Sequence, residues 1–298
     1  SEVLANTFFT TEPLEVFRLQ EFNLSGYLVD DLGNPMPNQP INVTFRSSTH
    51  YLITDSMGFV EKNITLSAKH ALGLHVAQWS YNGHEYYLPT SSSQSIIVTA
   101  STSISLESEK AIVTVGDSFE FSGRIVDDMG NPLSTNLNFL FHGQYVDTLI
   151  TDSDGRFSYE YMIPHYTEAG SNTVTVQYVA EEFYLPSSSI LMLQVKHDIR
   201  IEMGEFEGLL NSTIPVTGFV YDRADRPVEG LNVRLVMNSD FLPDSEFLPI
   251  DGVTNANGEF SIPLNIPFGT QLGYHNLSVT FAGDNEYHLN STESRIFI

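Results

Sequence analysis

LVDDLGNP, at residues 28–35, is a polar turn motif that the chain repeats. It returns as IVDDMGNP at residues 125–132 and, less closely, as VYDRADRP at residues 220–227. The closing proline recurs after 97 residues, from Pro35 to Pro132, and after a further 95 residues, at Pro227. Because a fixed period of this length is typical of tandem structural units, the chain is predicted to contain three similar domains.

A second motif follows each copy, and an aromatic tail closes it. The second motif is ITDSMGFV at residues 53–60, ITDSDGRF at 150–157 and VTNANGEF at 253–260. The tails are YNGHEYYLPTSS, YVAEEFYLPSSS and FAGDNEYHLNST. We expect domain breaks near Ala100 and His197, which gives domains at residues 1–99, 100–197 and 198–298.

The hydrophobic pattern inside each copy has period two, which indicates β-strands. In NTVTVQY, for example, Val174, Val176 and Tyr178 alternate with polar residues. Each copy holds roughly seven strand-length runs separated by Gly, Pro, Asn and Asp, and none holds an amphipathic helix. The sequence therefore predicts an all-β chain of three tandem immunoglobulin-like sandwiches. Since the linkers lack Gly and Pro, we expect a rod of about 100 Å.

Two details of the copies predict local structure. Trp79, the only tryptophan, aligns with inward-facing residues of the other copies and is expected in the core. In the second copy the apolar set Leu137, Phe139 and Phe141 lies one residue out of phase with its counterparts, which indicates a bulge or a shifted turn.

The three motifs together resemble the prokaryotic immunoglobulin-like repeats of bacterial and archaeal surface proteins. The tail FAGDNEYHLNS, at residues 281–291, is most similar to the group-3 bacterial type. The resemblance covers the whole chain three times. It implies a stalk, an adhesive module or a spacer on an extracellular protein, in some cases beside a catalytic domain.

Composition excludes several classes of partner. The 298 residues include 37 acidic and 13 basic side chains, a net charge of −24, and no cysteine. Such a surface repels nucleic acid and anionic membranes. No run of 18 apolar residues occurs, so direct membrane insertion is not expected. The absence of cysteine excludes disulfides and thiolate metal sites.

The motif TDSDGRF raises the question of calcium, since Asp152 and Asp154 have the spacing of ligands in a calcium loop. The matching places hold Asp55 and Met57 in the first copy, and Asn255 and Asn257 in the third. What all three retain is a glycine and an Asx residue, which is turn chemistry. We therefore expect no cofactor, and calcium at Asp152 and Asp154 is the less favoured reading.

Six sequons offer sites for N-glycosylation. They lie at Asn23, Asn42, Asn63, Asn211, Asn276 and Asn290, with none in the middle copy. Asn23 alternates with Phe22 and Leu24, so its side chain is expected to face outward, as a glycan requires. Solvated asparagine without a glycan is the equally weighted alternative.

One insertion breaks the repeat. The distance from the motif proline to the Asx residue of the second motif is 20 residues in the first two copies but 28 in the third, from Pro227 to Asn255. The eight extra residues fall within 238–252 and bring apolar side chains among acids and prolines, namely Phe241, Leu242, Phe247 and Leu248. A partner contact is one interpretation. Burial on the insertion's own sandwich is the other.

No catalytic constellation emerges, and histidine spacing matches no metal motif. We therefore expect a non-enzymatic extracellular or cell-surface protein, or a fragment of one, that works as a structural stalk or an adhesive module. Its partner would be a protein or glycan at the cell surface, or a second copy in a surface assembly. The alternative is a ligand-binding region, for carbohydrate or protein, of a secreted enzyme.

Overall fold

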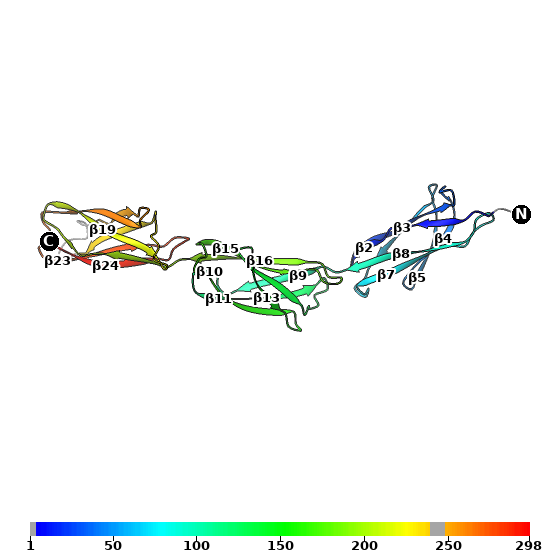
Figure 1. Cartoon of the computed structure of the whole chain (residues 1–298), viewed down its shortest axis with the longest axis horizontal. Helices are drawn as coiled ribbons and strands as arrows, with labels where there is room; N and C mark the ends of the chain where they lie inside the picture. The colour runs from blue at the N-terminus through cyan, green and yellow to red at the C-terminus, as the bar shows by residue number, and fades with distance from the viewer. Residues whose placement is uncertain (1–3, 239–247) are drawn as a thin grey trace.

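The chain consists of three tandem immunoglobulin-like β-sandwich domains that follow one another along an elongated rod (Figure 1). The computed structural model describes residues 4–238 and 248–298. Within these residues it holds 24 strands and no helix, so no helix there is long and apolar enough to cross a membrane. Eight strands fall in each domain, and each domain pairs a three-stranded sheet with a five-stranded one.

In domain 1 the three-stranded sheet has the order β1-β3-β6 and the five-stranded sheet the order β2-β8-β7-β4-β5. All pairs are antiparallel except β2 with β8. The strands are β1 (Thr7–Thr10), β2 (Leu14–Phe17), β3 (Glu21–Asp30), β4 (Pro40–Phe45), β5 (Ser48–Ile53), β6 (Phe59–Thr65), β7 (Gly73–Tyr81) and β8 (Thr90–Thr99).

Domain 2 repeats this arrangement with the sheets β9-β11-β14 and β10-β16-β15-β12-β13. Here the parallel pair is β10 with β16. The strands are β9 (Thr102–Ser108), β10 (Ile112–Thr114), β11 (Ser118–Asp127), β12 (Asn136–Phe141), β13 (Gln144–Ile150), β14 (Arg156–Met162), β15 (Gly170–Tyr178) and β16 (Ser187–Lys196).

Domain 3 has the sheets β17-β19-β22 and β18-β24-β23-β20-β21, with β18 parallel to β24. The strands are β17 (Ile199–Met203), β18 (Phe206–Glu207), β19 (Ser212–Asp222), β20 (Asn232–Asn238), β21 (Ile250–Val253), β22 (Glu259–Ile266), β23 (Tyr274–Phe281) and β24 (Asn290–Phe297).

Each domain has one strand more than the seven expected, because its first strand is divided between the two sheets. In domain 1, β1 pairs with β3 in one sheet, and β2 pairs with β8 in the other. The break between β1 and β2 contains Pro13, which cannot donate to a ladder hydrogen bond.

Each domain has its own core, built from the inward residues of its two sheets. Trp79 is fully buried on β7, as its alignment predicted. Its Nε1 donates to Gln94 Oε1 at 3.1 Å, and Gln94 Nε2 donates to the carbonyl of Glu12 at 2.7 Å. The single polar atom of the indole is therefore paired inside the core, as burial requires.

The expected irregularity in the second copy is present. The register between β12 and β13 shifts at Phe139 and Leu140, and Val146 is the extra residue on β13. The β11–β12 connection brings its apolar set one residue closer to the motif proline than in domain 1. The bulge restores the inward–outward alternation, so that Asp152 of the next turn still lies 20 residues after Pro132.

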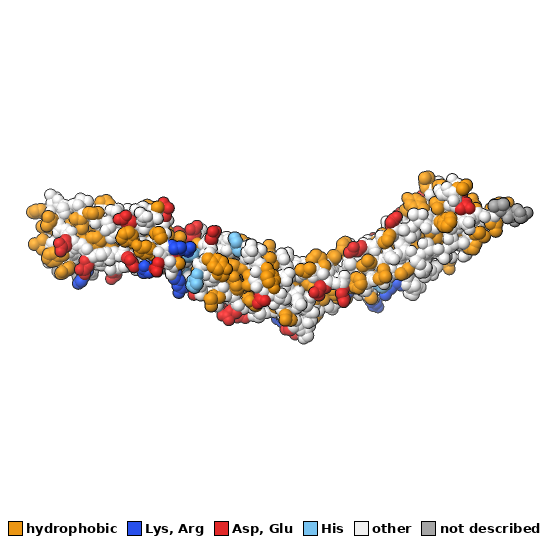
Figure 2. Space-filling view, viewed as in Figure 1, with side chains coloured by type: hydrophobic (Ala, Val, Ile, Leu, Met, Phe, Trp, Pro, Cys, Tyr) orange, Lys and Arg blue, Asp and Glu red, His pale blue; other side chains and the backbone are white. Residues whose placement is uncertain are grey.

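The three domains are joined without spacer residues. Ala100 forms a bridge to Tyr184, and His197 forms one to Tyr287, so each linker residue pairs with the last loop of the domain that follows. Figure 2 shows a continuous outline with a bend in the middle of the rod. The exact domain limits expected from sequence stay predictions.

Candidate functional site

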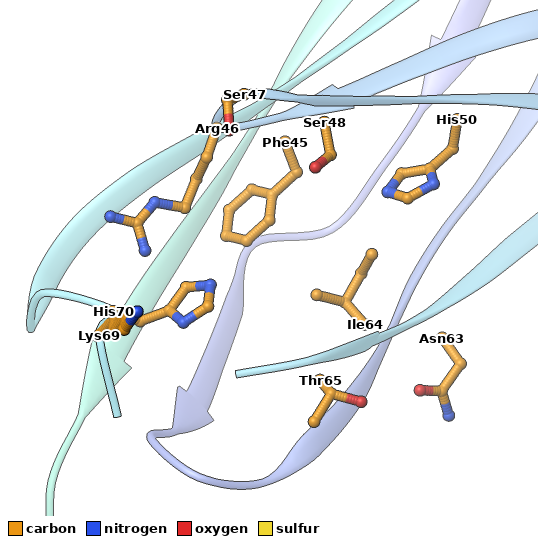
Figure 3. Close-up of a pocket in the computed structure, with 10 residues that line it drawn as sticks. All are labelled: Phe45, Arg46, Ser47, Ser48, His50, Asn63, Ile64, Thr65, Lys69 and His70. Atoms are coloured by element: carbon orange, nitrogen blue, oxygen red, sulfur yellow. The ribbon is translucent and has the colours of Figure 1, made fainter. Parts of the chain in front are cut away.

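A groove lies at the end of domain 1 that faces domain 2. One wall is the hairpin between β4 and β5, and the other is the loop between β6 and β7 (Figure 3). The groove collects polar and basic side chains over two apolar ones. The lining consists of Phe45, Arg46, Ser47, Ser48, His50, Asn63, Ile64, Thr65, Lys69 and His70.

Local bonds hold both walls in place. Arg46 begins the hairpin turn with φ of 57°, a left-handed conformation. In the opposite loop, the N–H of Ser67 lies 2.9 Å from His70 Nδ1 and orients the imidazole. His75 Nε2 lies 2.8 Å from the carbonyl of Ala71, which ties the loop to β7.

The charge of this groove is opposite to that of the chain. Arg46 and Lys69 line it, together with His50 and His70, and no Asp or Glu is among the lining residues. Within the described part of the chain, neither Arg46 nor Lys69 forms an ion pair. Glu21 reaches only the rim, where it accepts weak hydrogen bonds of 3.5 and 3.4 Å from Asn63 and Thr65.

Domain 2 has a groove at the matching place, but its lining is aromatic. Tyr145 and Tyr166 line it and are 60 % and 84 % exposed, whereas Tyr161 packs on the core ring of Phe141 at 5.1 Å. Burial raises the pKa of Tyr161. Gln144, Asn172 and other polar residues complete the lining. The exposed aromatic faces can stack on a sugar ring, and the exposed amide of Gln144 can hydrogen-bond its hydroxyls.

In domain 3 the sequence insertion falls in the connection of the corresponding hairpin. It separates β20 from β21, which correspond to β4 and β5. Phe241, Leu242 and Phe247 lie outside the described residues, and Leu248, at the edge of the described part, is 72 % exposed. The contact role expected for these four residues therefore stays a prediction.

The structure accounts for Asp152 as a turn residue. Its carboxylate accepts hydrogen bonds of 2.8 Å from the N–H groups of Asp154 and Arg156. Asp55 and Asn255 accept the matching pairs in the other domains. Because a neutral asparagine does the same work, no charge on the turn is required. Among residues 4–238 and 248–298, no group of three or more His, Asp or Glu could hold a metal ion.

The six sequon asparagines are distributed over strands and turns. Asn23, Asn63, Asn211 and Asn276 are exposed, whereas Asn42 and Asn290 are half-buried. Asn23 faces outward on β3 as expected, directly opposite Asn63 on β6. A glycan on Asn63 would stand at the rim of the domain 1 groove.

A buried ion pair links domains 1 and 2 at their junction. Arg18 follows β2 and reaches the DDMGNP turn, where Nη2 donates to Asp127 at 2.8 Å and Nε to Asp128 at 3.1 Å. The side chains of Arg18, Asp127 and Asp128 are only 8 %, 2 % and 11 % exposed. Burial raises the pKa of Asp127, but the hydrogen bonds from Asn131 and Arg18 outweigh it and hold that pKa below its usual range.

An aromatic contact completes this first junction. Phe183 of domain 2 lies against Gly73 of domain 1, where a Cβ would come within 3.1 Å of the ring. The matching glycines, Gly170 and Gly273, have no such neighbour within 4 Å. Gly73 is therefore needed both for its φ of 108° and for the close approach of the next domain.

At the junction between domains 2 and 3, basic side chains of both domains reach across. Arg223 takes the place of Asp128 in the turn motif and donates to the carbonyl of Val115 at 3.0 Å. It lies 3.8 Å from Asp117 and Asp198. Lys196 Nζ donates to the carbonyl of Asp284 at 2.6 Å, and His197 Nε2 lies 2.9 Å from the carbonyl of Thr167. The first junction thus has its cation in the preceding domain, whereas the second has one cation in each of its two domains.

Sequence reasoning missed Arg18, Arg223 and the grooves. Two signals were present. Basic residues are scarce, and Arg223 replaces an acid in an otherwise acidic motif. Neither signal identifies a partner, because Arg18 and Asp128 are 110 residues apart in the chain.

Comparison with known proteins finds likenesses of fold. No family model matches the chain, and no curated protein sequence matches it. An I-band fragment of titin matches with a TM-score of 0.47 at 11 % identity, over 98 % of both chains. A tetra-tandem repeat from the extending region of a large adhesion protein matches at 0.45 and 13 %, over 98 % of this chain and 73 % of that one. The Escherichia coli adhesin FdeC matches at 0.41 and 14 %, over 99 % and 98 %.

Proposed function

We propose that this chain is a non-enzymatic extracellular or cell-surface module, a rod of immunoglobulin-like domains that serves as a stalk or as part of an adhesin. The observation that carries the proposal is the construction of the two junctions. A stalk must set the distance and direction between its ends, so its domains must be held to one another.

The contacts at the first junction support a held geometry. Arg18 bonds two carboxylates in a nearly solvent-free setting, and such charge-assisted bonds are stronger and more directional than neutral ones. The linkers begin pairing with the next domain at Ala100 and His197, with no flexible residues between. These features favour a bent rod of defined shape over loosely linked beads.

The surface location rests on composition and sequons. A strongly acidic surface favours solubility and resists nonspecific association. Four of the six sequon asparagines are exposed, as N-glycosylation would require. Similarity to the group-3 bacterial type of immunoglobulin-like repeat is part of the same proposal, as is the absence of catalysis.

Two measurements test this function. Brief protease treatment of intact cells of the source organism should release fragments of the chain, because a surface rod is accessible. X-ray scattering of the purified chain should give a maximum dimension of about 100 Å, from three domains of roughly 30–35 Å each. A chain protected in intact cells, or a compact particle with folded-back domains, would contradict the proposal.

A second candidate function is favoured by the tyrosine-lined groove of domain 2. Tyr145 and Tyr166 expose their rings in one groove with the exposed amide of Gln144. This arrangement suits a binding region, for carbohydrate or protein, attached to a secreted enzyme. The sequence around the chain in its full gene separates the two: a surface anchor favours the stalk, and a hydrolase domain favours the accessory region.

A further inference from the structure

We propose that the basic groove of domain 1 binds the carboxylate of an acidic sugar at the end of a glycan. This inference rests on the proposed surface function and deepens it, since it gives the rod a specific ligand. It starts from an anomaly of charge: in a chain of net charge −24, the groove is lined by Arg46, Lys69, His50 and His70 and by no acid.

The fold does not need a basic side chain at the positions of Arg46 and Lys69. In domain 2, His142 occupies the hairpin position of Arg46, and Tyr166 occupies the loop position of Lys69. The same strands flank the same groove there. Arg46 holds a left-handed φ of 57° and His142 a similar φ of 48°, so the hairpin takes this conformation without arginine. Because the fold does not require Arg46, its guanidinium is available for a ligand contact.

Arg46 and Lys69 come from the two opposite walls of the groove. Figure 3 shows Arg46 from the hairpin and His70 from the opposite loop on the same side of the Phe45 ring, with the Lys69 label next to His70. A guanidinium binds a carboxylate with two parallel hydrogen bonds, and an ammonium nearby adds a point charge. Ser47, Ser48 and Asn63 offer hydroxyl and amide groups for sugar hydroxyls, while Ile64 offers an apolar contact for the ring.

The charge of the whole chain decides which anion can enter. At physiological salt the Debye length is about 8 Å, so an isolated carboxylate in the groove responds mainly to the groove itself. A long polyanion would extend over acidic surface and be repelled. A single acidic sugar on an otherwise neutral glycan meets the attraction without the repulsion.

Calorimetric titration of the full chain with small saccharides tests the proposal. The probes are 3′-sialyllactose and a disaccharide that ends in glucuronic acid, with lactose as the neutral match. The chain is produced without N-glycans, because a glycan on Asn63 would stand at the groove. The acidic probes should bind at least about tenfold more tightly than lactose, and preference between them tells which carboxylate sugar fits.

Substituting the corresponding residues of domain 2 into domain 1 supplies the test variant. Arg46→His with Lys69→Tyr installs the domain 2 residues and should lower affinity for the acidic probes about tenfold. The control is Lys110→Ser with Arg156→Ser, which removes an equal positive charge from domain 2. It should leave affinity for the acidic probes within about twofold. Arg46→Gly should lower affinity while the melting temperature stays equal or rises, which excludes misfolding as the cause.

Three results overturn the inference: lactose binds as tightly as the acidic probes, the Arg46→His with Lys69→Tyr variant keeps its affinity for them, or neither acidic probe binds. None of these results bears on surface exposure in intact cells, so the groove can fail while the proposed rod function stands.

Discussion

Gly155 has a dual role in the turn between β13 and β14. Its φ is 72°, and a Cβ there would collide with the carbonyl oxygen of Ile125 on the neighbouring strand. Gly130 has a similar φ of 80°, but a Cβ on it would meet no atom within 4 Å. The two glycines therefore separate the cost of the backbone conformation from the cost of the collision.

We predict that Gly155→Ala destabilises domain 2 more than Gly130→Ala does. The backbone cost is about 1 kcal/mol at either position, and the collision adds about 1–3 kcal/mol at Gly155 alone. Because three domains need not unfold together, hydrogen exchange in β13 and β14 is the appropriate measurement. Equal losses of stability in the two variants would show that the carbonyl of Ile125 moves aside without cost.

The same turn tests the calcium reading. Asp154→Asn should leave calorimetric titration with calcium unchanged, with no binding heat before or after the substitution. The reason is that the Asp154 carboxylate makes no contact in the turn, whereas Asp152 accepts both backbone bonds. A titratable calcium site that disappears in this variant would make the turn a metal loop.

Residues at one position can differ while their role stays constant. His75, Asn172 and His275 occupy matching places on β7, β15 and β23, and each side-chain nitrogen meets a carbonyl four residues earlier. The spacing of the histidines in the sequence matches no metal motif. The structure shows instead a tie between the strand and the loop that precedes it.

We predict that His275→Asn is tolerated and His275→Leu is not. His275 is 6 % exposed and lies 2.7 Å from the carbonyl of Gln271. Leucine would leave that carbonyl without its donor, at a cost of about 1–3 kcal/mol, whereas asparagine preserves the bond as in domain 2. Exchange rates of the amides at 267–273 report the change, and similar rates in both variants would refute the tie.

At the scale of strands, sequence alone predicted the pattern well. The alternation of apolar and polar residues predicted that Trp79 lies in the core, and the phase shift at Phe139 predicted an irregularity, which is the bulge on β13. Both signals are local, because side-chain direction alternates along a strand whatever the partner. The division of the first strand between two sheets was not predicted, since it depends on which distant strand each half pairs with.

The grooves were beyond sequence analysis for a related reason. Arg46 and Lys69 belong to a hairpin and to a loop, and only the pairing of β4 with β7 brings these two connections to one end of the domain. The insertion at 238–252 was visible as a change in spacing. That it falls at the hairpin corresponding to a groove wall of domain 1 became visible only once β20 and β21 were aligned with β4 and β5.

For the whole molecule, Arg18 is the residue that ties domain 1 to domain 2 through a buried ion pair. We predict that Arg18→Gln opens the first junction and broadens the distribution of distances in X-ray scattering. Leaving Asp127 and Asp128 buried without their cation would cost about 3–5 kcal/mol, so the domains separate instead. Arg200→Gln is the matched control, because Arg200 also pairs with carboxylates, exposed and within one domain. An unchanged scattering profile in Arg18→Gln would show that the contact of Phe183 with Gly73 holds the junction without the ion pair.

Acid should open the same junction, and the direction of the Asp127 pKa gives the window. Its folded pKa lies below the usual range, so the stabilisation is complete above the ordinary aspartate value of about 3.9 and is lost as pH falls through the folded pKa. Scattering profiles at pH 7 and pH 5 should therefore coincide, and the maximum dimension or its spread should change only below about pH 4. Arg18→Gln should lack this transition, since without the guanidinium the junction no longer depends on ionised Asp127. A transition already complete at pH 5 would mean that another group holds the two domains together.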